Sequence, residues 1–476
     1  MRRVLATLVV LLALGGVLAP TALGHAVLIS ASPASGAKLG AAPSEAVLRF
    51  SETVQLLKPE DFTVVDSTGA SVARGPGARD PSNSHLLRIP LNNPLPEGTY
   101  TIRYLVVSAD SHIIAGALAF GVGPKPVGPP YLGGSTGSGG PSETGPWAVS
   151  ARFLELIGLG GLLGLLAFRW LIWRPAFRRA ELEGEEAQAG LTWGRDLFWV
   201  GFGVLAVGSM LAEGYLLVTK SASALGTSVW GALTDPSGIS QVLGDTRFGS
   251  LVQLRGALLF GLFAIGIWQF LSEFGSERSP RAASPSGRVV PALLMAALIL
   301  AVLGGISAQG HASTAPLDTL SIAADLTHLT SVAVWIGGLA LVAIVLWRAP
   351  KAVEGGGGRA LAGAVLTRFS RVATIVVGVA ILTGVLRTIA ELDNPAQLWD
   401  TAYGRSIIYK ILILCPIAVL ALQSRRVVTA LRIKRVRQPN APTLAMVDRN
   451  VWVELVLALA VVVVASLLVA QVPGRT

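Results

Sequence analysis

From Trp147 to residue 476, the chain consists mainly of long apolar stretches separated by short polar loops. An α-helix needs about 20 apolar residues to cross the hydrocarbon core of a bilayer, and these stretches are close to that length or longer. The chain is 52% hydrophobic and only 14% charged, and its mean hydropathy of +0.61 is typical of a membrane protein. We therefore predict that residues 147–476 form an all-α polytopic membrane bundle of about eight helices. The expected spans are residues 148–171, 196–219, 249–271, 289–307, 321–347, 366–388, 406–423 and 450–472.

The basic residues of the loops predict the orientation of this bundle. Lys and Arg gather in alternate loops, whereas the loop of residues 308–320 contains neither. Because cytoplasmic loops carry the excess of Lys and Arg, the segment before the first span is expected outside the cytoplasmic membrane, on its periplasmic or extracytoplasmic side. This arrangement also accounts for the net charge of +10, so we predict no nucleic-acid partner. The expected cytoplasmic basic residues are Arg169, Arg174, Arg178, Arg179, Arg278, Arg281, Arg288, Arg348, Lys351, Arg359, Arg425, Arg426, Arg432, Lys434, Arg435, Arg437 and Arg449.

Composition divides the remainder of the chain. Residues 1–24 contain two arginines, an apolar core and small residues near their end, which predicts a signal peptide whose removal leaves His25 as the first residue. Residues 123–146 are almost wholly Gly, Pro, Ser and Thr, which is typical of a linker. The intervening residues 25–122 have an ordinary mixed composition and are expected to form a separate domain. A single cysteine, Cys415, excludes an intrachain disulfide and a CxxC motif.

The domain of residues 25–122 has the pattern of an all-β fold. Its apolar segments are short, alternate with polar residues or are rich in β-branched side chains, and turn-forming stretches separate them. The expected strands are AVLRF (46–50), FTVV (62–65), LLRIPL (86–91), GTYTIRYLVVS (98–108) and ALAFGV (117–122). Strands at this spacing favour a Greek-key sandwich of the cupredoxin or immunoglobulin type.

Three residues of this domain are candidate metal ligands. As an N-terminal residue, His25 offers both an imidazole and an α-amine, while Asp110 and His112 are two residues apart and share a face of an extended segment. Three nitrogens and one carboxylate suit tetragonal Cu(II). The same spacing also arises by chance at a strand edge, with His25 as a mere cleavage site, and the residues alone leave both interpretations open. His85, in the turn-rich stretch DPSNSHLL, is expected to be a surface residue.

Short motifs along the domain add more specific information. They are the initial His-Ala, the S-P-A-x-G-A turn, the F-S-E strand end, the G-x-Y-x-I-x-Y strand and the S-A-D-x-H motif. Together they resemble the periplasmic copper-binding CopC family. The resemblance implies a Cu(II) site formed by His25, Asp110 and His112, with Glu52 of F-S-E as a weaker candidate nearby. Residues 25–146 contain no methionine, so the Met-rich Cu(I) site of some relatives is not expected here.

Two of the five histidines lie in the membrane part. His311 comes just after the fourth predicted span, and Asp325 and His328 are three residues apart in the fifth, so they share one helical face. His328 is expected about 10 Å inside the outer end of its helix. Ionisable groups at that depth are costly in lipid and should face the bundle interior, as a metal route or as ion pairs that stabilise packing. For three further residues we expect such ion pairs: Glu454, Arg255 and Arg387.

The membrane part also contains extended motifs. These are TRFGSLVQLRG (246–256), D-x-x-H-x₆-W-x-G-G-L beginning at Asp325, TAYGRSIIYK (401–410) and RNVWVEL (449–455). They resemble the CopD-type copper-resistance membrane proteins, so the chain looks like a fusion of CopC and CopD. The resemblance implies movement of copper into or across the membrane, with His311, Asp325 and His328 as candidate ligands on the route.

The sequence predicts a copper-transport protein and not an enzyme. It has no G-x-x-x-x-G-K-[ST] loop and no D-K-T-G motif, so neither ATP nor a primary pump is expected. Each positive charge that moves inward gains about 2.3 kcal/mol per 100 mV of membrane potential, which favours import for an unassisted route. The leading hypothesis is that the sandwich captures Cu(II) outside and the bundle passes copper inward, with a reductase or an extracytoplasmic copper chaperone as partner.

Two alternatives remain at this stage. The protein could hold copper at the outer surface for resistance, or deliver it to a cuproenzyme, without transport. The bundle could instead be a redox module in which His311 and His328 bind haem. Copper accumulation inside the cell separates the first alternative from transport, and a Soret band in the purified protein would identify the second.

Overall fold

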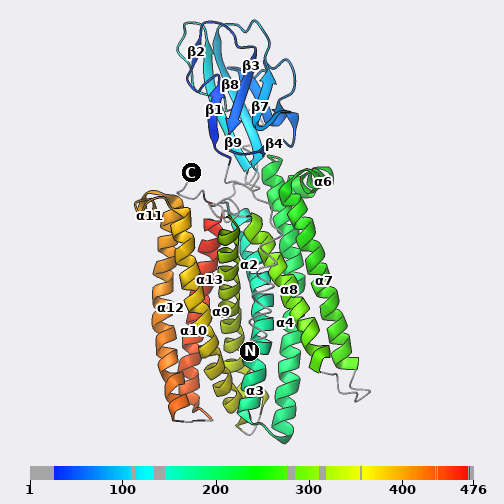
Figure 1. Cartoon of the computed structure of the whole chain (residues 1–476), viewed down its shortest axis with the longest axis vertical. Coiled ribbons are helices and arrows are strands. Elements are labelled where there is room, and N and C mark those ends of the chain that lie inside the picture. Colours follow the sequence, from blue (N-terminus) through cyan, green and yellow to red (C-terminus); the bar gives the residue numbers. More distant parts are fainter. Residues whose placement is uncertain are drawn as a thin grey trace.

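The chain folds into a β-sandwich that stands on one end of a bundle of long helices (Figure 1). The structure is a computed structural model that describes residues 26–108, 113–132, 145–275, 285–309, 318–353, 356–434, 436, 438–469 and 471. The predicted signal peptide and residues 133–144 of the predicted linker lie outside the described residues.

Nine strands within the described residues form two packed sheets, which confirms the predicted sandwich. One sheet has the order β1-β3-β7-β6, and the other has the order β2-β9-β8-β4 with β5 also paired to β8. Consecutive strands repeatedly change sheet, as in a Greek key. The strands are β1 (Leu28–Ser32), β2 (Lys38–Leu39), β3 (Glu45–Phe50), β4 (Val54–Gln55), β5 (Phe62–Asp66), β6 (Ala78–Asp80), β7 (Asn83–Pro90), β8 (Gly98–Ser108) and β9 (Ile113–Val122).

Alternating side chains explain why these segments form a core between the sheets. In β3, Ala46, Leu48 and Phe50 are buried, while Arg49 on the opposite face is exposed. Phe50 packs edge-on against Tyr104 of β8, with ring centroids 5.6 Å apart. Burying one large apolar side chain stabilises the fold by roughly 1.5–3 kcal/mol. The face of β3 that carries the apolar residues is therefore the face that is buried.

Eight helices of the described residues are long and apolar enough to cross a membrane, as predicted. The first combines α2 (Pro146–Ala167), the π-helical turn η2 (Phe168–Trp173) and α3 (Arg174–Ala180). The others are α4 (Gly184–Ala224), α7 (Arg247–Gly275), α8 (Pro285–Gln309), α9 (Asp318–Ala352), α10 (Gly357–Glu391), α12 (Ala402–Ile433) and α13 (Ala441–Leu468). Short helices lie between the spans or in the sandwich: α5 (Val229–Leu233), α6 (Pro236–Asp245), α11 (Gln397–Asp400) and η1 (Pro59–Asp61).

The helices extend well beyond the spans predicted from hydropathy. Helix α4 has 41 residues, so it is about 60 Å long, whereas the apolar pattern predicted a span of residues 196–219 only. A bilayer core of about 30 Å covers half of that length. Hydropathy therefore locates the part of each helix in lipid and misses the polar turns that continue it into water.

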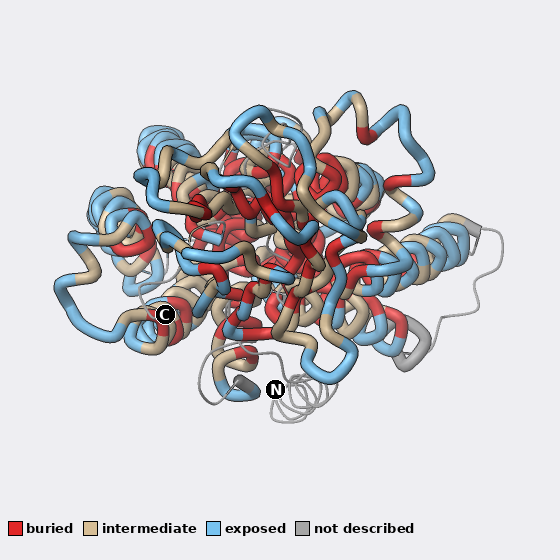
Figure 2. Tube along the Cα trace, turned by 90° about the horizontal axis from the view of Figure 1, so that it is seen from above, coloured by how far each residue is buried: buried red, intermediate tan, exposed pale blue. Residues whose placement is uncertain are grey.

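Helix α9 lies at the centre of the bundle because small residues let its neighbour approach closely. It packs against α10, α2, α13 and α8, and 61% of its most apolar window is buried. A Cβ atom on Gly164 of α2 would lie 2.7 Å from Cα of Gly337 in α9, so only glycine permits this backbone contact. Figure 2, in which the sandwich lies over the bundle, shows buried residues of both concentrated in the middle of the molecule.

The sandwich is docked on the bundle through an apolar cluster. Leu57 and Val107, at one end of the sandwich, belong to the same cluster as Leu225 beyond α4, Val242 of α6 and Phe248 of α7. Because this contact joins strand ends to helix ends, the orientation of the sandwich relative to the bundle is defined. The sequence alone left this question open.

The beginning of the predicted linker adds to the sandwich. The Gly128 N–H donates to Oγ1 of Thr99 at 3.0 Å, and the Tyr131 N–H donates to Oγ1 of Thr101 at 2.8 Å. Both acceptors belong to β8, so this Pro- and Gly-rich stretch lies along a strand.

Candidate functional site

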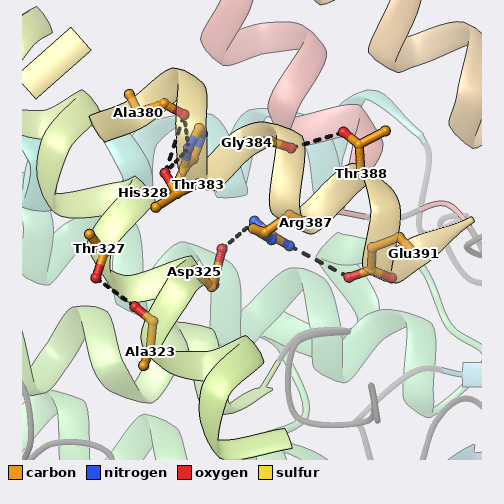
Figure 3. Close-up of polar contacts among 10 residues, drawn as sticks. All are labelled: Ala323, Asp325, Thr327, His328, Ala380, Thr383, Gly384, Arg387, Thr388 and Glu391. Atoms are coloured by element: carbon orange, nitrogen blue, oxygen red, sulfur yellow. Dashed lines mark hydrogen bonds and ion pairs between the residues drawn. The ribbon is translucent and has the colours of Figure 1, made fainter. Parts of the chain in front are cut away.

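His328 lies between α9 and α10, where its imidazole is oriented by partners on α10 (Figure 3). Its Nδ1 is 2.9 Å from the Ala380 carbonyl oxygen and 3.1 Å from Thr383 Oγ1. The Thr383 hydroxyl donates its own proton to the Val379 carbonyl at 2.7 Å. Both partners of Nδ1 therefore act as acceptors, which assigns the proton to Nδ1 and leaves the lone pair of Nε2 available as a ligand.

The ring of His328 fits this position because Gly384 faces it. A Cβ atom at Gly384 would lie 3.2 Å from Cε1 of His328, which is tighter than an ordinary contact. The sequence analysis did not identify Ala380, Thr383 or Gly384 as partners. A carbonyl acceptor has no residue signature, and only the pairing of α9 with α10 brings these groups to the ring.

Asp325, one turn before His328, has a different partner. Its Oδ1 forms an ion pair with Nη1 of Arg387, and Nη2 of Arg387 is 3.8 Å from Oε1 of Glu391 (Figure 3). Arg387 thus forms the expected ion pair. The positive charge of Lys410 on α12 also attracts the carboxylate of Asp325 and disfavours a positive charge on His328. Among the described residues, no hydrogen bond or ion pair joins Asp325 to His328. The two predicted route residues share a helical face, but Asp325 forms its ion pair with Arg387 and does not contact His328 through a hydrogen bond or ion pair in the described part of the chain.

The described part of the sandwich brings together the segments that flank its predicted ligands. The Val27 N–H donates to Ser51 Oγ at 2.8 Å, and the Ser51 N–H donates to the Val27 carbonyl at 2.9 Å. Glu52 follows directly and is 3% exposed. Val54 of β4 pairs with Ser108 of β8. The start of the domain, Glu52 and the end of β8 therefore meet at one end of the sandwich.

Four predicted site residues, His25, Asp110, His112 and His311, lie outside the described residues. In the sequence, Val27 follows His25 by two residues and Ser108 precedes Asp110 by two, and both described residues belong to the end of the sandwich just defined. That end is also the end that docks on the bundle, because neighbouring Val107 belongs to the docking cluster. In the part of the chain that is described, no three His, Cys, Asp or Glu side chains gather as a metal-binding group.

Comparison with known proteins identifies two families in the chain. Residues 28–123 match the CopC domain, and residues 363–468 match the family described as Copper resistance protein D, or CopD. Copper resistance protein C of Pseudomonas syringae pv. tomato is 33% identical over 121 residues, which cover 24% of this chain and 93% of that protein. The chain belongs to the CopC–CopD copper proteins.

The chain is also similar to other known proteins, over different lengths. Copper transport protein CutJ of Bacillus subtilis is 28% identical over 396 residues, which cover 82% of this chain and 65% of CutJ. Protein YobA of Escherichia coli K12 is 34% identical over 106 residues, covering 22% of this chain and 82% of YobA. The crystal structure of CopC from Methylosinus trichosporium OB3b is 29% identical and covers 21% of this chain and 93% of that chain, with a TM-score of 0.19.

The CopD match begins within α10 and ends with α13. Arg387 and Lys410 lie inside the matched region, whereas Asp325 and His328 on α9 precede it. The histidine site of this CopC–CopD protein is therefore formed by one helix outside the CopD match and one helix inside it.

A second buried charge cluster of the CopC–CopD chain lies on other helices. Arg255 of α7 places Nη1 2.8 Å from Oε1 of Glu155 in α2 and Nε 2.7 Å from Oε1 of Glu213 in α4. The side chain of Arg255 is 1% exposed. This is the expected ion pairing of Arg255, and it joins three helices. Glu454, by contrast, is buried but has no basic partner among the described residues, so the ion pair expected for it is not formed there.

Proposed function

We propose that the CopC domain captures Cu(II) outside the cytoplasmic membrane and that the bundle passes copper inward. His25, with its α-amine, Asp110 and His112 would bind the metal, Glu52 would support the site, and residues 1–24 would export the domain and then be removed. Membership of the CopC–CopD proteins supports copper as the cargo. The multi-pass bundle supports a location in the membrane.

The docking of the sandwich is the observation that carries this proposal. The end that carries the Val27–Ser51 hydrogen bonds and Glu52 faces the bundle, and Gln241 of α6 donates a hydrogen bond from Nε2 to the Leu57 carbonyl. A metal released from that end would enter the outer end of the bundle directly. A sandwich that served only to hold copper would not need this orientation.

His328 is the residue of the bundle best suited to receive copper. Its Nε2 lone pair is available while Nδ1 is held by α10, which is the arrangement that orients a histidine ligand. The Arg387 ion pair neutralises Asp325 and stabilises α9 beside α10, so Asp325 acts in this proposal as a positioning residue. Inward movement would use the membrane potential, about 2.3 kcal/mol per charge for 100 mV.

Copper content of fractionated cells tests the proposal. Cells that express the wild type, His112→Ala or His328→Ala would be separated into cytosol and membranes, and copper would be measured by mass spectrometry. His85→Ala is a matched control, because His85 is a half-buried histidine on β7 of the same sandwich. We expect the wild type and the control to raise cytosolic copper and both site variants to abolish the rise.

Two other results would reject the transport proposal. Copper that rises only in the membrane fraction, and depends on His112 but not on His328, would show surface sequestration or delivery. A Soret band in the purified protein that is lost in His328→Ala would show haem ligation.

A further inference from the structure

A basic pocket lies between α10 and α12 at the end of the bundle opposite the sandwich. It has a volume of about 320 Å³, and Arg371 of α10 and Arg425 and Arg432 of α12 line it. The orientation predicted from the loops places this end in the cytoplasm. None of its lining residues is a partner of His328 or belongs to the sandwich, and the proposed copper route does not use it.

The arginines of the pocket have no anionic partner in the described part of the chain. Arginines elsewhere at the same end do have partners: Arg169 pairs with Glu273 at 3.1 Å and Arg195 pairs with Asp196 at 3.2 Å. No carboxylate lines the pocket. Three guanidinium groups around one cavity repel each other, and an anion between them would relieve that repulsion.

Four hydroxyl groups line the pocket, and those of Ser370 and Thr429 remain free to donate a hydrogen bond. Thr367 and Thr374 use their hydroxyl protons on the carbonyls of their own helix, with Oγ1 to oxygen distances of 2.8 and 2.7 Å. Ser370 and Thr429, which also line the pocket, make no side-chain hydrogen bond among the described residues. Guanidinium and hydroxyl donors that converge in this way match the several acceptor oxygens of a phosphate group.

An apolar stripe continues from the pocket toward the middle of the bundle. Leu422 precedes Arg425 by three residues on α12, and Ile375 follows Arg371 by four on α10, so each shares a helical face with an arginine of the pocket. Both side chains are more than half exposed. In a membrane this stripe faces acyl chains, while the arginines lie near the level of the headgroups.

We propose that this pocket binds the phosphate group of an anionic phospholipid, whose acyl chains lie along the apolar stripe of Ile375 and Leu422. The three arginines and the hydroxyls of Ser370 and Thr429 form the headgroup site. The site is independent of copper binding and is an addition to the proposed transport function.

Native mass spectrometry of the delipidated full chain in detergent tests this site. Phosphatidylglycerol and phosphatidylcholine would be added at equal concentrations to the wild type and to a variant with Arg371→Gln, Arg425→Gln and Arg432→Gln. The matched control removes three exposed arginines of the same end outside the pocket, Arg178→Gln, Arg179→Gln and Arg359→Gln. We expect the wild type and the control to prefer phosphatidylglycerol and the pocket variant to bind it roughly a hundredfold more weakly, since each basic residue contributes about fivefold.

Three results would overturn the proposal. The pocket variant and the control could bind phosphatidylglycerol equally, or the wild type could show no preference over phosphatidylcholine. Inorganic phosphate at millimolar concentration could also occupy the pocket and displace the lipid completely, which would identify a free anion as the ligand. If the triple variant does not fold, Ser370→Ala with Thr429→Val keeps all charges and should still lower the affinity several-fold.

Discussion

The two buried charge clusters of the bundle differ in whether they retain an atom that is available to bind a metal. Around Arg255, opposite charges on α2, α4 and α7 face one another, and both glutamates bind the same guanidinium. Between α9 and α10, the Asp325–Arg387 ion pair is also satisfied, but His328 beside it retains a ring nitrogen with a free lone pair. An ionisable residue in a membrane span is thus not in itself a functional residue; a spare ligand atom is the distinguishing feature.

The largest effect is expected when the Arg255 cluster is broken. Arg255→Met leaves Glu155 and Glu213 buried without their cation, which typically destabilises by about 3–5 kcal/mol. We expect the largest fall in thermal stability of the detergent-solubilised protein, measured by size-exclusion chromatography after heating. Replacing all three residues by Met should restore most of the stability. A single variant as stable as the wild type would contradict a structural role for the cluster.

Arg387→Met should have a smaller effect on stability. The side chain of Arg387 is 24% exposed, so water partly compensates Asp325 when the cation is removed. We expect a loss of about 2 kcal/mol by the same heating assay. Asp325→Asn in addition to Arg387→Met should recover part of this loss. No recovery would show that Arg387 stabilises the helices through other contacts.

His328→Gln separates the ligand role from the structural role. Glutamine can still donate to the Ala380 carbonyl but has no imidazole, so the stability should change by about 1 kcal/mol or less. Copper accumulation should be lost as completely as in His328→Ala. If His328→Gln transported copper normally, the Nε2 atom of His328 would have no role in copper movement. The functional difference between the two charge clusters would then be refuted.

A half-buried carboxylate outside the membrane gives a small effect that depends on pH. Burial raises the pKa of Asp61 in η1 from its usual 3.8 to about 6, although its side chain accepts a hydrogen bond from the Lys58 N–H at 2.9 Å. The folded state therefore binds more protons than the unfolded state between about pH 4 and 6, and stability falls as the pH rises through that range. Asp61→Asn removes this dependence.

The Asp61→Asn variant should accordingly gain stability at pH 7 and not at pH 4. Because Asp61 is partly exposed, the gain should stay near about 1 kcal/mol. Differential scanning fluorimetry of the full chain at both pH values measures it. Equal gains at pH 4 and pH 7 would show that the charge of Asp61 is not the cause.

Much of the architecture follows from local patterns in the sequence. Alternation in segments such as β3 predicts the sandwich, since burial of every second side chain is a property of the strand itself. Hydropathy predicts eight membrane helices, because each span must be apolar whatever its neighbours are. The copper ligands His25, Asp110, His112 and His311 were inferred from residue types and motifs, and they stay predictions.

The pairing of distant groups was decided only by the tertiary structure. Arg387 joins Asp325 across 62 positions of sequence, and Arg255 joins Glu155 across 100. The docking hydrogen bond from Gln241 to Leu57 spans 184 positions. The sequence by itself determined which segments enter the core or the membrane, since that depends on the side chains of one segment. Partners depend on which helices touch, and close backbone contacts such as that of Gly164 with Gly337 determine this in three dimensions.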